Sequence, residues 1–170
     1  MARRLARRLV TRLHALFPAL SERWLARHPV ARSADVPWAP VPLPLARARL
    51  GFMTTAGVHG TAQPPFDMSD PDGDPGWRAL RADAPPDAFT ITHDYYDTRA
   101  ARRDLEVVYP LRRLLELVAA GRLGSLTARH AGLMGHVDGA HVETLVRRTA
   151  PEVAALFRDE RADIVLLAPA

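Results

Sequence analysis

The chain has 170 residues, of which 48% are hydrophobic and 25% are charged, and its formal net charge is +4. This is the size of one domain or slightly more, and the apolar fraction excludes wholesale disorder. The absence of cysteine excludes a disulfide framework, a thiolate zinc site and an iron–sulfur centre. The chain as written therefore carries no thiol nucleophile.

The positive charge is concentrated at the N-terminus. Residues 1–32 carry a net charge of +7, whereas the remainder carries −3. The basic residues are all arginine, which is typical of GC-rich coding sequence, so the high isoelectric point is not taken as a sign of nucleic-acid binding. We predict a mildly acidic body with a basic arm and no nucleic-acid partner.

Residues 1–31 are predicted to form an amphipathic helical arm. Five leucines recur at helical spacing while arginines fill the other face: Leu5, Leu9, Leu13, Leu16 and Leu20. Packing of the leucine stripe against the body is the favoured interpretation, and contact with a partner or an anionic membrane surface is the alternative. No stretch has the length and apolarity of a membrane span or a secretory signal, so we expect a cytoplasmic location.

Residues 32–46 are rich in proline and are predicted to be an extended linker to a domain over residues 47–170. Within this domain the sequence predicts two strands, at 48–55 and 162–168. It also predicts a helix at 111–120 and two helical pieces at 140–148 and 151–158. Residues 64–87 are rich in Pro, Asp and Gly and are predicted to be a long loop with a short helical turn near Trp77.

The last predicted strand is a continuous apolar run, which is typical of a strand buried on both faces of a parallel sheet. The predicted fold class is α/β, with a partial parallel-sheet, Rossmann-like domain that follows the basic amphipathic helical arm. Ala170 comes two residues after this strand. We therefore expect the end of the chain to lie at the sheet edge where open α/β folds bind ligands, and the domain to be half of an α/β unit.

Generic motifs of catalysis and metal binding are weak. An EF-hand starting at Asp70 would have Pro75 where Gly is needed and Arg81 where Glu is needed, so we reject it. The histidines show no spacing typical of metal ligands, and the sequence contains no nucleophile elbow, phosphate loop or dinucleotide fingerprint.

A series of short motifs from residue 36 onward is more specific. In chain order they are Val36-Pro37-Trp38-Ala39-Pro40, Phe52-Met53-Thr54-Thr55-Ala56-Gly57-Val58-His59, Gln63-Pro64-Pro65-Phe66-Asp67 and Ile91-Thr92-His93-Asp94-Tyr95-Tyr96-Asp97. They continue with Asp104-Leu105, Val108-Tyr109-Pro110-Leu111, Gly124-Ser125-Leu126, Arg129-His130, Met134-Gly135 and Thr149-Ala150-Pro151-Glu152-Val153-Ala154. Together they resemble the glycine/sarcosine/betaine/D-proline reductase selenoprotein B family.

The resemblance implies an oxidoreductase that acts on X–H and Y–H to form an X–Y bond with a disulfide as acceptor. The implied reaction is reductive cleavage of a C–N bond in an amino acid or betaine-like substrate. The implied partners are another reductase subunit, which in some relatives carries a pyruvoyl group, and a thiol redox protein. No cofactor is expected in this chain itself.

In that family a catalytic selenocysteine or cysteine directly follows the strand that matches Asp163 to Pro169. We therefore expect the chain to be truncated at a recoded UGA codon at position 171. A genuine stop or a gene fragment is the alternative.

The resemblance and the predicted parallel sheet together give the candidate site residues. His59, His130, His93 and Asp94 are candidate catalytic residues, because a histidine could stabilise a selenolate or protonate a leaving amine. Thr54, Thr55 and Gly57 are candidate ligands of the substrate carboxylate.

Two hypotheses from other classes remain. The chain could be a non-catalytic docking subunit, or a metal-dependent enzyme that uses His and Asp side chains.

Overall fold

The computed structural model describes residues 39–41 and 43–170, together with positions 10, 13, 16, 17, 19, 22 and 23. Most of the predicted arm over 1–31 and most of the predicted linker thus lie outside the described residues. The chain divides into two compact units, residues 1–40 with 94–97 and residues 41–93 with 98–170. We call the second of these the sheet unit. The boundaries predicted after residues 31 and 46 remain predictions.

A mixed sheet organises the sheet unit, with β1 (Arg49–Thr54) at its centre. Successive parts of β1 pair in parallel with β5 (Ser125–Leu126) and β6 (Arg129–Leu133). From Leu50 to Thr54, β1 also pairs in parallel with β7 (Ile164–Ala168). The antiparallel strand β3 (Trp77–Arg81) extends the sheet beyond β6. The predicted α/β class and the predicted parallel strands are confirmed.

A separate two-stranded antiparallel sheet is formed by β2 (Val58–Gly60) and β4 (Phe89–Ile91). The sequence did not predict these strands, each of which has three residues. In the described part of the chain, short 3-10 turns complete the connections at Leu45–Arg47, Pro86–Ala88 and Leu105–Val107.

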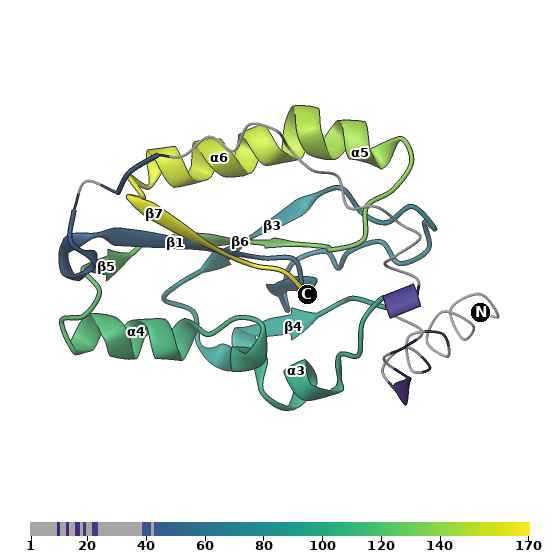
Figure 1. Ribbon diagram of the computed structural model, residues 1–170, viewed down its shortest axis with the longest axis horizontal. Coiled ribbons are helices and arrows are strands. Elements are labelled where there is room, and N and C mark those ends of the chain that lie inside the picture. The colour runs from purple at the N-terminus through teal and green to yellow at the C-terminus, as the bar shows by residue number, and fades with distance from the viewer. Residues whose placement is uncertain are drawn as a thin grey trace. The chain divides into compact units, whose positions relative to one another are not determined.

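Helices lie on both faces of the main sheet (Figure 1). On one face, α5 (His141–Thr144) continues through a π-helical segment, Leu145–Thr149, into α6 (Ala150–Asp159). On the other face lie α3 (Arg99–Arg103) and α4 (Leu111–Ala119). The two helical pieces predicted at 140–148 and 151–158 are therefore one continuous run. Pro151, which lacks an N–H, falls at the start of α6 directly after the widened π turn.

The core has one layer on each face because neighbouring residues of a strand point to opposite sides. Met53, Ala131 and Val165 belong to the layer under α6, with Val153, Leu156 and Phe157. Phe52 belongs to the opposite layer, where its ring lies 5.5 Å from that of Tyr109 and 6.1 Å from that of His130.

Two predictions about strands and helices are wrong. The short helical turn expected near Trp77 is strand β3, because its pairing with β6 overrides the local turn signals. Strand β7 is not buried on both faces. It pairs with β1 on one side, and Leu166 and Leu167 are 43% and 58% exposed. A continuous apolar run indicates a preference for strand structure, whereas the burial of a strand depends on which other elements pack against it.

No helix among the described residues is long and apolar enough to cross a membrane.

The contact between α6 and β1 requires glycine at position 51. A Cβ at Gly51 would lie 2.5 Å from Cδ1 of Phe157. We expect Gly51→Ala to lower the free energy of unfolding by about 1–3 kcal/mol, because the buried ring would have to shift. Urea unfolding followed by circular dichroism measures this change.

A double-mutant cycle supplies the control for the Gly51 prediction. In a Phe157→Leu background the smaller side chain should reduce the cost of Gly51→Ala by at least about 0.5 kcal/mol. Equal costs in the two backgrounds would show that the ring is not the constraint.

Candidate active site

The carboxyl ends of β1, β6 and β7 lie at the same edge of the sheet, so the loops after β1 and β6 come close to the residues that follow β7. Because β1 and β7 run parallel, Thr55 lies beside the end of β7 and its N–H donates to the carbonyl of Ala168 at 3.1 Å. The N–H of Ala170 donates to the Thr55 hydroxyl at 3.0 Å. The loop after β1 therefore holds the end of the described chain by backbone and side-chain bonds.

Gly135, which follows β6, lies against both Thr55 and Ala170. A Cβ at Gly135 would lie 2.7 Å from the carbonyl oxygen of Ala170 and 3.2 Å from the Thr55 hydroxyl oxygen. Only a residue without a side chain leaves room for the segment after β7. We call Thr55, Gly57, His93, Gly135 and Ala170 the strand-end site.

Gly57 joins the strand-end site to β4. Its φ is +72°, and a Cβ there would lie 2.3 Å from the carbonyl oxygen of Thr92 and 3.1 Å from Cβ of His93. The N–H of Gly57 donates to the carbonyl of Leu133 at 2.8 Å, and its carbonyl accepts from the N–H of Thr92 at 2.9 Å. The predicted role of Gly57 as a carboxylate ligand stays a prediction, while the structure shows its backbone engaged in these two bonds.

His93 is the candidate histidine that bonds to this region. Its side chain is buried, and its Nε2 accepts a hydrogen bond from the N–H of Gly135 at 3.3 Å. Asp94 is buried and belongs to the other compact unit, with residues 1–40. Its predicted catalytic role stays a prediction.

Thr54 and His59 have other partners. The Thr54 hydroxyl is fully buried and accepts from the N–H of Ala56 at 3.2 Å. His59 lies in β2, where Nδ1 bonds to the carbonyl of Gly60 at 2.9 Å and Nε2 bonds to the Thr92 hydroxyl at 2.8 Å. These contacts fix the His59 ring within the small sheet, and its predicted catalytic role is untested.

His130 lies in the core under α4. It is fully buried on β6, and its Nδ1 bonds to the Tyr109 hydroxyl at 2.9 Å. Its Nε2 has no hydrogen-bond partner among the residues that the structure describes. Burial lowers the pKa of His130 to about 4 and raises the pKa of Tyr109, because both charged forms would lose their hydration. The ring is therefore neutral at pH 7 and is surrounded by core residues.

The acidic loop and the later histidines form surface contacts. Nε2 of His141 lies 2.9 Å from a carboxylate oxygen of Asp70, and this hydrogen bond raises the pKa of His141 and lowers that of Asp70. Nε2 of His136 bonds to the carbonyl of Pro71 at 3.0 Å. Within the part of the chain that the structure describes, no group of three His, Asp or Glu side chains is arranged to hold a metal ion.

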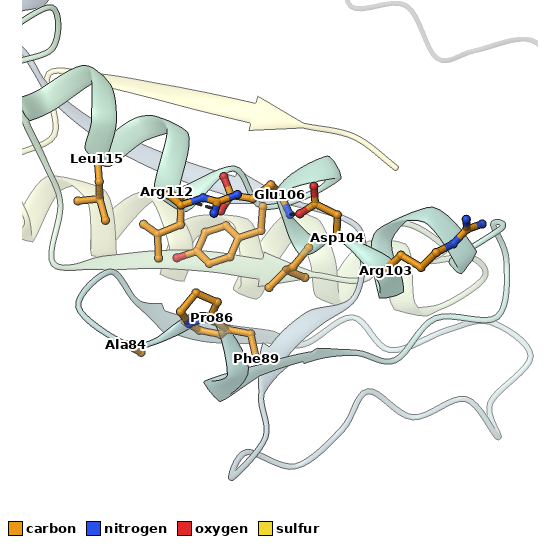
Figure 2. Close-up of a pocket in the computed structure, with 11 residues that line it drawn as sticks. Ala84, Pro86, Phe89, Arg103, Asp104, Glu106, Arg112 and Leu115 are labelled. Atoms are coloured by element: carbon orange, nitrogen blue, oxygen red, sulfur yellow. Dashed lines mark hydrogen bonds between the residues drawn. The ribbon is translucent and has the colours of Figure 1, made fainter. Parts of the chain in front are cut away.

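A cavity of about 530 Å³ lies among α4, the turn at Leu105–Val107 and the residues that lead into β4. Figure 2 shows Pro86 and Phe89 on one wall and Leu115, Arg112 and Glu106 on the opposite wall. The Glu106 carboxylate accepts the N–H groups of Arg112 and Arg113 at 2.9 and 3.1 Å, so it caps α4. None of the cavity's lining residues belongs to the strand-end site.

Sequence reasoning missed two residues with clear roles in this geometry. Tyr109 is the hydrogen-bond partner of His130, and Thr92 joins β4 to both Gly57 and His59. Each belongs to a quoted motif, but its partners are more than twenty residues away in the sequence, and only the fold brings them together.

Comparison with known proteins gives one relative at significant similarity. The chain is 28% identical over 130 residues to the D-proline reductase subunit gamma of Acetoanaerobium sticklandii. The aligned region covers 76% of this chain and 52% of the relative, so the chain spans about half of the relative's length. No family model matches the chain, and no solved structure matches it. The protein that this chain is similar to is thus a subunit of a reductase.

Burial of His130 predicts that the free energy of unfolding falls in acid. His130 has a folded-state pKa of about 4 against 6.5 for an ordinary histidine. Its contribution to stability is therefore complete above pH 6.5 and is lost as the pH falls toward 4. We expect this residue alone to remove about 2 kcal/mol from the free energy of unfolding between pH 7.5 and pH 5.

Urea unfolding at both pH values checks this prediction in two variants. His130→Leu should reduce the loss of stability on acidification. His141→Leu should increase it, because the raised pKa of His141 stabilises the fold at low pH and its contribution is lost as the pH rises. The idea fails if His130→Leu has the same pH dependence as the unaltered chain.

Proposed function

We propose that this chain is a subunit of an amino-acid reductase that cleaves a C–N bond next to a carboxylate. The observation that carries the proposal is the similarity over 130 residues to a D-proline reductase subunit. The strand-end site supports it, since three strand ends meet where a reacting group could be placed and where open α/β folds bind ligands.

The nucleophile of this proposal is a selenocysteine or cysteine directly after Ala170. The strand-end site supports this placement, because the Thr55 hydroxyl accepts the N–H of Ala170 and Gly135 lies closer to the Ala170 carbonyl than a residue with a side chain could. A chalcogenolate there would supply a strong nucleophile that is also a good leaving group. The threonine and glycine fix the backbone that would carry it.

The net reaction balances as a two-electron reduction. The bond between Cα and the amine nitrogen breaks, and a C–H and an N–H bond form. A dithiol supplies two electrons and two protons and becomes a disulfide. A partner subunit would hold the substrate amine, through a pyruvoyl carbonyl where the amine permits it, and a thiol redox protein would supply the dithiol.

The gene gives the first test. We expect codon 171 to be UGA or a cysteine codon, followed by a reading frame that continues the similarity to the reductase subunit. DNA sequencing past codon 170 checks this. A different stop codon, or a downstream frame without that similarity, would remove the proposed nucleophile.

Turnover gives the second test. With its partner subunit and dithiothreitol, the full reading frame should convert D-proline to 5-aminopentanoate, which chromatography with mass detection measures. Serine at the nucleophile position should lower the rate at least about 100-fold, because a neutral hydroxyl is a poor nucleophile at neutral pH. The serine variant is the matched control, and equal product from both proteins would contradict the mechanism.

Elemental analysis of the purified protein separates the alternatives. Selenium without zinc or iron supports the reductase. Stoichiometric zinc or iron would instead favour a metal-dependent enzyme. A reading frame without selenocysteine or cysteine directly after Ala170 would favour a docking subunit.

A further inference from the structure

We propose that His93 is a positioning residue for the segment after β7 and that it acts through the backbone N–H of Gly135. Its importance for catalysis rests on the proposed function, whereas its effect on the backbone does not. The proposal follows from a continuous series of contacts that runs from His93 through Gly135 to Ala170.

The first contact, between His93 and Gly135, determines which nitrogen of the His93 imidazole carries the proton. Nε2 of His93 accepts a hydrogen bond from the N–H of Gly135 at 3.3 Å. A ring nitrogen can accept only when it carries no proton, so this bond requires the neutral ring with its proton on Nδ1. Because the side chain is 4% exposed, water cannot readily replace it as the acceptor.

The second contact transmits that position to the end of β7. Gly135 lies so close to Ala170 that a Cβ would come within 2.7 Å of the Ala170 carbonyl oxygen. The N–H of Ala170 also donates to the Thr55 hydroxyl at 3.0 Å, and Thr55 in turn lies against Gly135. The segment after β7 is thus in contact with the loops after β1 and β6, and His93 bonds to the second of these loops beside the bridge between Ala56 and Met134.

The other buried histidines of the sheet unit do not share this arrangement. Nδ1 of His59 bonds to the carbonyl of Gly60 in β2, and its Nε2 bonds to the hydroxyl of Thr92, directly after β4. Nδ1 of His130 bonds to Tyr109 in the core. His59 is therefore a matched control, since it is also buried and hydrogen-bonded but has different partners.

The chemical consequence concerns the geometry of the reacting group. A displacement of about 1 Å can cost about 100-fold in rate. If His93 positions the backbone and does not touch the substrate, its loss should lower kcat and leave KM nearly unchanged. Glutamine, which can place an acceptor near the position of Nε2, should restore most of the rate.

Amide hydrogen exchange followed by NMR tests the proposal without relying on activity. In His93→Leu the N–H of Gly135 should exchange about fivefold faster, which corresponds to the loss of one hydrogen bond of about 1 kcal/mol. In His93→Gln the exchange rate should stay within about twofold of the unaltered chain. In His59→Leu the rate at Gly135 should not change.

Unchanged exchange at Gly135 in His93→Leu would overturn the proposal, as would an equal acceleration in His59→Leu or a failure of glutamine to restore protection. Should His93→Leu not fold, the ring nitrogen shifts of the unaltered chain decide the matter. The Nδ1–H tautomer supports the proposal and the Nε2–H tautomer overturns it. These readouts can fail while D-proline is still reduced, so the two proposals fail separately.

Discussion

The parallel pairing of β1 with β7 is the interaction on which the rest of the structure depends. Five residue pairs, from Leu50 with Ile164 to Thr54 with Ala168, join segments that lie more than 110 positions apart. Parallel strands present their carboxyl ends at the same edge. This pairing therefore brings the loop after β1 to the residues that follow β7, and it creates the strand-end site.

Close backbone approach is the second constraint on that site. Gly57 and Gly135 lie where a Cβ would overlap a neighbouring carbonyl oxygen, so three loops can meet with backbone in contact. Backbone groups and one threonine hydroxyl define the geometry around Ala170. This close packing of backbone restricts the positions that the segment after β7 can take, and it is the part of the site on which the proposed placement of a reactive residue depends.

Buried histidines have different roles in this fold, and their burial alone does not distinguish them. His130 is neutral because the core removes water from it, whereas Nε2 of His93 accepts the backbone N–H of Gly135. The first contributes a pH-dependent stability, and we propose that the second positions a loop. Separating these roles requires the hydrogen-bond partner of each ring nitrogen, which lies far away in the sequence.

By itself, the sequence determined the α/β class, strand β1, helix α4 and the parallel relation of the last strand, because hydrophobic periodicity and capping signals are local. It also singled out Thr55, Gly57 and His93 as site candidates together with His59 and His130. Only the tertiary structure decided which of these meet. Burial of β7, the strand at Trp77 and the contact of His93 with Gly135 all depend on neighbours distant in sequence, and local propensity carries no information about such neighbours.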